Sequence, residues 1–405
     1  MLHETWFSRS YLSGLAGELG VSVAIVTILT GLPWIGSIGQ LMSAWWLSRA
    51  VSAKRYALIA MGVGRSLWLL VMLFALLPGI SRAHWMMLTA GLACFGAVCS
   101  SSGEVAWLAW IQGIVPPQRR GVFFGVRQRF LVIGILGANL LGSIVLGRGA
   151  RGSFFGYALL GGLGVPAGWI SLVLLSMVPR SPRPSAVKFG REEFLRPLRD
   201  PRFRVVLVLW PMINCVLQLM GPFFPYFFTS EVGVPMSRIV LWIMLGNVGS
   251  LLTVRFFGAR IDRTGNALEV LLWMGLLLSA SPLAYVLPSK AHISWIAPPE
   301  HFISGIANGA LKVAILSLLW GVTPEERNSL YFCVYTAFEG ACGALGTFAG
   351  GALIRFLQVT PRLAINGSAF RAFFVAGATL RALVIAGGTY WAYRTLIRDP
   401  QRWAK

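Results

Sequence analysis

The chain is poor in charged residues, and poorest in acidic ones. Charged residues make up 12% of its 405 residues, with 14 Asp or Glu against 35 Lys or Arg. A water-soluble protein of this length could not cover its surface with so few charges, because 56% of the residues are apolar and the mean hydropathy is +0.70. Apolar runs of roughly 20 residues recur along the whole length, so the sequence predicts an all-α, multi-pass membrane protein. No long stretch alternates with a period of two, which argues against a membrane barrel.

The sequence also lacks the patterns that carry catalysis or hold a cofactor. It has no nucleotide-binding glycine loop, no zinc-spaced set of His and Cys, and no nucleophile elbow, so we expect neither an enzyme nor a cofactor. The first ten residues contain no basic segment followed by an apolar one, and no cleavable signal is expected. The cysteines lie inside apolar runs and are expected to be small buried side chains: Cys94, Cys99, Cys215, Cys333 and Cys342.

The net charge of +21 lies mainly in short loops between apolar runs. Such loops are typical of the cytoplasmic side of a membrane protein, and the pattern does not suggest a nucleic-acid partner. If the chain crosses the membrane twelve times, both of its ends fall on the same side. Most of the basic loops fall on that side too. We therefore expect a cell membrane (inner or plasma membrane) protein with both termini in the cytoplasm.

A long internal repeat relates the two halves of the chain. Residues 104–130 match residues 312–338 at a constant offset of 208 positions. Chance would give about two identities over such a window. The identical pairs are Val105/Val313, Ala106/Ala314, Leu108/Leu316, Gly113/Gly321, Pro116/Pro324, Arg119/Arg327, Phe124/Phe332, Val126/Val334 and Phe130/Phe338. Each copy reads as an apolar helix, a loop with Pro and Arg, and a second apolar helix, so we expect two similar halves in the same orientation, related by a pseudo-twofold axis along the membrane normal.

A second match concerns the first helix of each half. The residues that follow Glu18 recur after Glu231 at an offset of 213, which predicts that both acids end their helices on the outer side. Only 17 residues precede Glu18, so helix 1 is shorter than helix 7 by roughly three turns. Either the start codon lies too late, or the helix is natively short.

The remaining helices follow from the apolar runs. The first bundle is expected over residues 1–178, a basic, proline-rich linker over 179–203, the second bundle over 204–395, and a basic tail over 396–405. After helix 1, the predicted helices are 22–47, 56–78, 85–114, 121–147, 153–178, 204–229, 237–257, 267–288, 298–321, 329–357 and 368–394.

Six plus six helices with a basic central loop resemble the major facilitator superfamily, and one motif supports the resemblance. That family carries Gly-x-x-x-Asp-Arg-x-Gly between helices 2 and 3, often repeated between helices 8 and 9. The second half here matches it with Gly258, Asp262, Arg263 and Gly265, whereas the first half keeps only Arg49. The resemblance implies that these loops latch the halves in the outward-open state, with the first-half latch altered.

The loops that contain Pro116 to Arg119 and Pro324 to Arg327 are similar to the 4–5 and 10–11 loops of the same family. We group Arg119 and Arg327 with the gating loops. The resemblance covers nearly the whole chain and implies transport, but it does not identify a substrate.

Two charges lie near the centre of the predicted membrane spans. Glu104 and Lys312 each precede the proline of their loop by 12 residues, which places both about 18 Å from the loop. A charge at this depth costs about 2.5–3.5 kcal/mol or more, so each is a functional candidate. Ser101 lies one turn from Glu104, and Asn308 lies one turn from Lys312. The resemblance implies that helices 4 and 10 line a central cavity, and we expect a breakable Glu104–Lys312 pair. A static pair between helices, or charges facing lipid, are the alternatives.

Further polar residues within the apolar runs are also candidates. Asn214 and Gln218 share a face of helix 7 and either bind a ligand or join helices. Glu339 could carry a proton or pair with an arginine, and Arg127 could enter the site or reach the membrane surface.

Other features have more ordinary expected roles. Arg65 and Arg381 are expected in structural pairs. Pro298 and Pro299 suggest the start of helix 10, with Glu300 at its outer lip. The Gly305-x-x-x-Gly309 spacing suggests close helix packing.

These features predict a secondary active transporter that moves a small solute by alternating access as a symporter or antiporter. Bases outnumber acids inside the apolar runs, which favours an anionic or zwitterionic solute. A proton or sodium ion is the expected coupling ion, and the expected partners are the small solute and the lipid bilayer, with the protein as a monomer. A transporter-like sensor or assembly factor, and a lipid or amphiphile translocator, are the alternatives.

Overall fold

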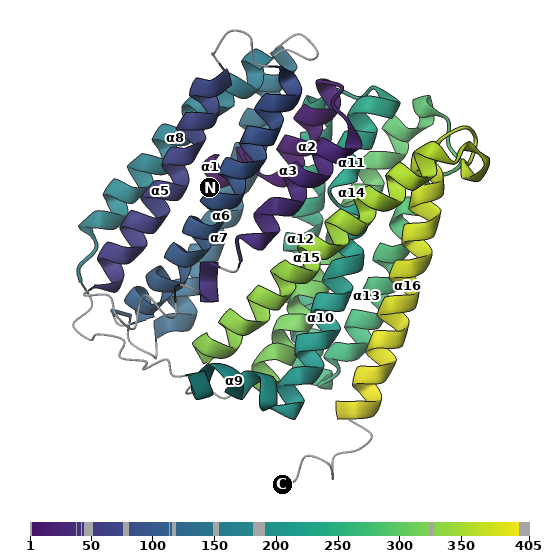
Figure 1. The fold of residues 1–405 in the computed structure, drawn as a ribbon. Coiled ribbons are helices and arrows are strands. Elements are labelled where there is room, and N and C mark those ends of the chain that lie inside the picture. Colours follow the sequence, from purple (N-terminus) through teal and green to yellow (C-terminus); the bar gives the residue numbers. More distant parts are fainter. Residues whose placement is uncertain are drawn as a thin grey trace.

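A computed structural model of the chain describes residues 2–37, 39–41, 43, 52–75, 81–112, 114–115, 119–148, 154–180, 191–323 and 328–396. Over these residues the fold is helical, and its only β feature is an isolated bridge between Ile365 and Ser368 (Figure 1). The prediction of an all-α membrane fold is confirmed, because ten of the described stretches are long and apolar enough to cross a membrane. The gating residues Arg49 and Arg327 lie outside the described residues.

The helices follow the predicted order. In the first half they are α1 (Leu2–Trp6), α2 (Arg9–Glu18), α3 (Val23–Ile35), α5 (Ala53–Ala75), α6 (Arg82–Gln112), α7 (Arg120–Arg148) and α8 (Phe154–Met177). The connecting helix is α9 (Arg191–Arg199). In the second half they are α10 (Pro201–Met220), α11 (Phe223–Phe227), the π-helix η2 (Phe228–Val232), α12 (Met236–Thr264), α13 (Ala267–Ala280), η3 (Ser281–Tyr285), α14 (Lys290–Val322), α15 (Asn328–Val359), η5 (Pro361–Leu363) and α16 (Ala369–Leu396).

Two predicted helices are not among the ten long apolar stretches of the described residues. Helix 1 is divided into the short segments α1 and α2. Helix α5 is long enough to span, but it carries Lys54, Arg55 and Arg65.

The first helices of the two halves are broken at matching positions. Helix 7 is interrupted between α10 and α11 at Gly221, and helix 1 is interrupted at Ser8, which lies 213 positions earlier. At the same offset, Gly20 and Gly233 both adopt the left-handed conformation, with φ of 67° and 79°. A side chain is disfavoured in this conformation, which explains glycine in both copies. The structure therefore extends the repeat that the sequence predicted around Glu18 and Glu231.

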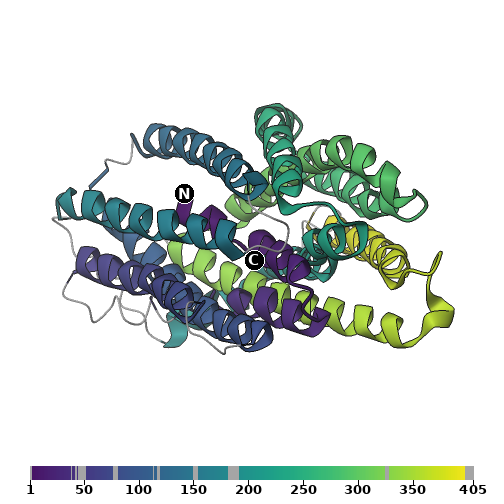
Figure 2. The same cartoon turned by 90° about the horizontal axis from the view of Figure 1, so that it is seen from above.

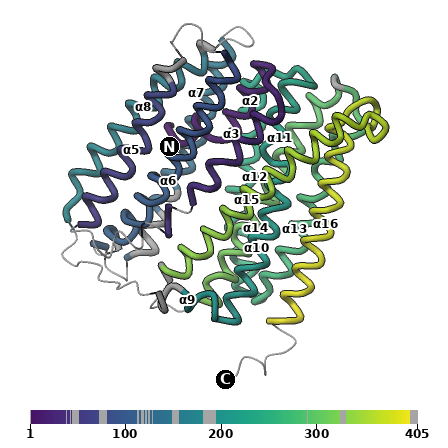
Figure 3. The backbone as a smooth tube through the Cα atoms, in the orientation of Figure 1, coloured from purple at the N-terminus to yellow at the C-terminus, as the bar shows by residue number. Residues whose placement is uncertain are grey.

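The helices form two groups, one from each half of the chain, and three pairs of helices make the main contacts between them. Helix α3 packs against α15, α7 against α12, and α2 against α11. Seen from above, the blue helices of the first half and the green and yellow helices of the second lie on opposite sides (Figure 2). Helices α2 and α3 lie close to the second group (Figure 3). We call the end that holds α9 and the C-terminal end of α16 the tail side, and the opposite end the far side.

Helix α14 differs from the prediction at its start. It begins at Lys290 after an N-cap at Ser289, so Pro298 and Pro299 lie inside it and not at its first turn. The predicted boundary was wrong because the segment before the prolines is itself helical, although each proline removes one backbone donor from the helix. Gly305 and Gly309 bring α14 against the backbone of α12 at Gly246 and Ser250, as the glycine spacing predicted.

Candidate functional site

Three polar residues that the sequence singled out lie together between α10 and α15. The indole Nε1 of Trp210 donates a hydrogen bond to Oε1 of Glu339 at 2.8 Å. The side-chain amide of Asn214 donates to the backbone oxygen of Glu339 at 2.9 Å. Gln218 lies one turn further along α10 and donates to Oδ1 of Asn214 at 3.2 Å. The Trp210 bond holds the Glu339 carboxylate, and the Asn214 bond holds the backbone of the same residue.

Two cations lie within electrostatic range of the Glu339 carboxylate, one from each half. Arg9 is the first residue of α2, and its guanidinium lies 3.8 Å from the centroid of the Trp34 ring. Its buried Nη1 has no hydrogen-bond partner among the described residues. Lys312 of α14 is exposed, and no hydrogen bond or ion pair joins it to a described residue. We call Arg9, Lys312 and Glu339 the central cluster.

The sequence analysis missed Arg9 as a site residue. Its segment is the weakest apolar run of the chain and gives no helical periodicity to place it. An arginine between two apolar stretches was the one available signal, since charges in spans are functional candidates. The partners of Arg9 come from α3 and α15, which lie far from it in the sequence.

The expected pair between Glu104 and Lys312 is not formed. The charges that act on Glu104 belong to its own half and are Arg65, Arg127 and Glu4, whereas Lys312 acts on Glu339. The physical reason is the way the halves meet. Contacts between them run through α2, α3 and α7 of the first half, which leaves α6 and α14 apart.

Glu104 lines a cavity of about 210 Å³ inside the first half. Arg65 and Ser100 line it as well, so Ser100 and not the predicted Ser101 shares the cavity with Glu104. The guanidinium of Arg127 lies 4.5 Å from the centroid of the Trp107 ring. Glu104 thus lies at a cavity that Ser100 and Arg65 also line, with Arg65 and Arg127 as its neighbouring cations.

The second half holds an equivalent cavity of about 240 Å³. Asn308 lines it together with Gln218, and at the offset of 208 Asn308 corresponds to Ser100 of the first cavity. The side-chain amide of Asn308 donates to the backbone oxygen of Ser304 at 2.8 Å. The internal repeat therefore gives each half its own polar cavity beside the central cluster.

Glu300 and His301 line the second cavity and do not lie at an outer lip. Oε2 of Glu300 lies 3.0 Å from Nδ1 of His301, and the hydroxyl of Tyr285 donates to the same carboxylate. This placement follows from the early start of α14, which puts both residues more than two turns inside the helix.

Arg65 and Arg381 join helices in equivalent pairs. Nη1 of Arg65 on α5 donates to the backbone oxygen of Gly168 on α8 at 2.8 Å. Nη1 of Arg381 on α16 donates to the backbone oxygen of Leu278 on α13 at 3.0 Å. The third and sixth helices of each half are thus tied by an arginine, which comes from the third helix in one half and the sixth in the other.

The gating motif of the second half lies at the tail-side end of α12. Gly265 ends the helix with φ of 65°, a conformation that favours glycine. Nε of Arg263 donates to the backbone oxygen of Ala259. Asp262 is exposed, as is Gly265, and Gly258 is half-buried.

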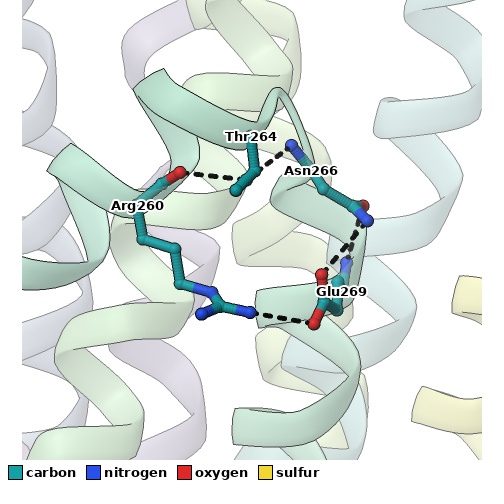
Figure 4. A network of polar contacts seen from close by, with 4 residues as sticks. All are labelled: Arg260, Thr264, Asn266 and Glu269. Carbon is teal, nitrogen blue, oxygen red and sulfur yellow. Dashed lines mark hydrogen bonds and ion pairs between the residues drawn. The ribbon is translucent and has the colours of Figure 1, made fainter.

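Charges beside this motif are paired between the end of α12 and the start of α13. Nη2 of Arg260 lies 3.1 Å from Oε1 of Glu269, and Asn266 and Thr264 complete the network (Figure 4). In the first half, Arg119 is exposed just before α7.

Hydrogen bonds tie the two halves together on the far side. The hydroxyl of Tyr226 donates to the backbone oxygen of Val21 at 2.9 Å. The hydroxyl of Ser13 donates to the backbone oxygen of Pro222. The backbone N–H of Met236 donates to Oε1 of Glu18. The repeat predicted that the first helix of each half matches the other, and these hydrogen bonds bring the two helices into direct contact.

This fold, with its repeated halves and polar residues between them, defines a multi-pass α-helical membrane protein of the transporter class. The family model of the Major Facilitator Superfamily matches residues 5–347. The chain belongs to this family, which places it among membrane transporters and not among enzymes.

Comparisons with individual proteins agree with the family. The chain is 23% identical over 191 residues to the "Uncharacterized transporter YwbF" of Bacillus subtilis (strain 168), a match that spans 47% of this chain and about half (46%) of that relative. Three solved structures share the fold. A mutant of the nucleoside transporter NupG has a TM-score of 0.72 and 11% identity, with 96% of this chain and 99% of that one covered. A bacterial homologue of the human lysosomal transporter Spinster has a TM-score of 0.71 and 15% identity, with 98% of this chain and 96% of that one covered. A D-xylose-proton symporter has a TM-score of 0.70 and 14% identity, with 95% of each chain covered.

Proposed function

We propose that the chain is a secondary active transporter that moves a small anionic or zwitterionic solute by alternating access. The observation that carries this proposal is the central cluster. Arg9 has a buried guanidinium nitrogen without a partner among the described residues, and Lys312, on the opposite half of the fold, is an exposed residue. A solute carboxylate or phosphate between them would satisfy both cations and would join the halves only while it is bound.

The charges of the central cluster also indicate the class of solute. Two cations face one carboxylate, so the cluster carries an excess positive charge of one when all three groups are ionised. A negative group on the solute would offset this excess. Glu339 offers a place for a positive group on the same solute, since a carboxylate has two acceptor oxygens and the indole of Trp210 donates to Oε1. A zwitterion such as an amino acid would fit both features.

The polar residues around the cluster would complete the site. Asn214 and Gln218 approach it from α10, Glu104 and Asn308 line the two cavities, and Arg127 acts on Glu104. Glu104 and Glu339 are the proposed proton carriers if transport is coupled to protons, with sodium as the alternative coupling ion.

The proposed orientation places the tail side in the cytoplasm. The described loops there carry Arg119, Arg180 and Arg263 among other cations, and this bias is the usual determinant of orientation. The far-side contacts through Tyr226 and Glu18 would then close the periplasmic or external side. Transport would require these contacts to break in one half of the cycle.

Counterflow in proteoliposomes tests the function. Purified full-length protein would be reconstituted with an excess of one unlabelled solute inside, and uptake of the labelled solute would be followed for a panel of amino acids, organic acids, sugars and organic cations. We expect transient accumulation of one or more anionic or zwitterionic solutes. Accumulation of only sugars or organic cations would overturn the proposed class, and no accumulation of any solute would favour a sensor or assembly role.

The role of Glu104 is tested in the same vesicles. Uptake driven by an imposed proton gradient should be lost in Glu104→Gln or in Glu339→Gln. Counterflow, which needs no ion gradient, should persist in Glu104→Gln, whereas Glu339→Gln should also weaken it because Glu339 contacts the solute. Gradient-driven uptake at the wild-type rate in both variants would reject proton coupling through these acids. A matched test with a sodium gradient separates the two coupling ions.

A further inference from the structure

A groove of about 650 Å³ runs along the outside of the first half between α5 and α8. Its lining is almost wholly apolar, and side chains along it are strongly exposed, among them Ile59 at 67% and Val173 at 56%. In a membrane-spanning protein such a surface faces lipid. From Leu58 to Leu70 the groove follows α5 for about 18 Å, slightly more than the roughly 15 Å of hydrocarbon in one leaflet. Its length therefore suits one acyl chain.

The tail-side end of the groove is cationic. The Lys54 amine donates hydrogen bonds to the backbone oxygens of Ser176 and Val178, both at 2.6 Å, and so bridges the ends of α5 and α8. Arg55 is exposed and lies one turn before Leu58, on the face of α5 that lines the groove. Arg180 is exposed just beyond the end of α8. Three positive side chains thus surround the place where a lipid headgroup would lie.

The sequence of the first half offers almost no acid to neutralise these cations. Between Glu18 and Glu192 it contains a single acidic residue, Glu104, which lies deep in the membrane span. The second half is different. At the offset of 214 that relates the two gating loops, Arg55 corresponds to Glu269, and Glu269 pairs with Arg260 across its own loop (Figure 4). The repeat therefore supplies a negative partner in one half and omits it in the other.

We propose that the groove binds an anionic phospholipid from the leaflet on the tail side. One acyl chain lies along α5 and α8, and the phosphate contacts Arg55, Arg180 and the remaining N–H of Lys54. Lipid phosphate provides the negative charge that the first half lacks. The proposed orientation makes this the cytoplasmic leaflet, but the site itself does not depend on which solute is moved or on whether transport occurs.

Native mass spectrometry of the full-length protein tests the headgroup preference. The protein would be equilibrated in micelles with equal amounts of phosphatidylglycerol and phosphatidylcholine that carry the same acyl chains. Wild type should retain phosphatidylglycerol in preference. The double variant Arg55→Gln with Arg180→Gln should lose about ten- to thirty-fold of that preference, because each basic residue near the membrane surface contributes roughly 1 kcal/mol. The control Arg204→Gln with Arg394→Gln removes two exposed cations from the tail side of the second half and should keep the preference.

A second variant tests the groove itself. A Cβ at Gly62 would meet only Leu172, at 3.7 Å, so a leucine at this position would extend into the groove without a backbone clash. Gly62→Leu should release the retained lipid while the thermal unfolding midpoint stays within a few degrees of wild type. Equal retention of both lipids by wild type, or an unchanged preference in the double variant or in Gly62→Leu, would overturn the proposal. A protein dimer that Gly62→Leu dissociates would identify a second copy as the occupant and would also overturn it.

Discussion

Oε1 of Glu18 accepts a hydrogen bond from the backbone N–H of Met236 at 2.9 Å, and this contact joins the two halves on the far side. Met236 is the first residue of α12, so the carboxylate lies where the helix dipole favours a negative charge. The other carboxylate oxygen accepts from the hydroxyl of Tyr157 at 3.3 Å, which holds Glu18 in place from its own half. The hydrogen bond between Glu18 and Met236 must therefore break if the far side is to open.

Replacing Glu18 by alanine should favour the open far side. A carboxylate at a helix N-terminus contributes about 1–2 kcal/mol, so the closed population should fall by roughly ten-fold relative to the open one. Spin labels at Ser22 and Arg238, which are exposed on the two halves, would report the change as a longer electron–electron distance.

Glu231→Ala is the matched control. Glu231 is the repeat-related acid, but it accepts from the hydroxyl of Ser368 within its own half, at 2.9 Å and 3.0 Å. Its loss should leave the distance between the labels unchanged. A Glu18→Ala distribution that matches wild type, or an equal effect of the two variants, would contradict a latch at Glu18.

The paired glycines after the first helices should be intolerant of a side chain. Gly20→Ala and Gly233→Ala should each cost about 1–2 kcal/mol of unfolding free energy, because both residues have positive φ. Space is not the cause, since no atom lies within 4 Å of the position that a Cβ would take at either site. Gly387→Ala, in the helical α16 with equal space, should be neutral or slightly stabilising. Unfolding by a graded series of denaturing detergent measures all three, and similar values for them would contradict this account.

Arg381→Ala should destabilise the second half. Arg381 is 3% exposed and donates to backbone oxygens of two helices, Leu278 on α13 and Leu217 on α10. Losing both bonds and leaving a cavity should cost about 3 kcal/mol, measured by thermal unfolding in detergent. Arg65→Ala, which removes the equivalent tie from a half-buried position, should cost less. An unfolding midpoint of Arg381→Ala equal to that of wild type would show that these bonds do not stabilise the bundle.

Hydropathy and the internal repeat together predicted most of the fold. Apolar runs of membrane length are a signal carried by local composition, and the match between Glu18 and Glu231 correctly placed the ends of the first helices. The same match includes Gly20 and Gly233, which both adopt the left-handed conformation, because backbone conformation at a turn is also a local property. The start of α14 was missed because two adjacent prolines resemble a helix start even when the helix continues through them.

The candidate site was only partly predictable, because its contacts are not local. Spacing from the loops predicts the membrane depth of Glu104 and Lys312, since a helix rises by a fixed distance per residue. Depth does not determine which helix a side chain meets. Lys312 and Arg9 each act on Glu339 across helices that are distant in the sequence, while α6 packs against α3 and α5 of its own half. Such an arrangement depends on how the two halves dock, which no short stretch of sequence encodes.

The most direct test of the central cluster is the affinity of the transported solute, measured by equilibrium binding of the labelled compound to purified protein. Lys312→Gln should weaken binding by roughly ten- to one-hundred-fold, because it removes one of the two cations that would contact the negative group of the bound solute. Arg394→Gln, which removes an exposed cation at the end of α16, should bind with wild-type affinity. Wild-type affinity in Lys312→Gln would contradict the account.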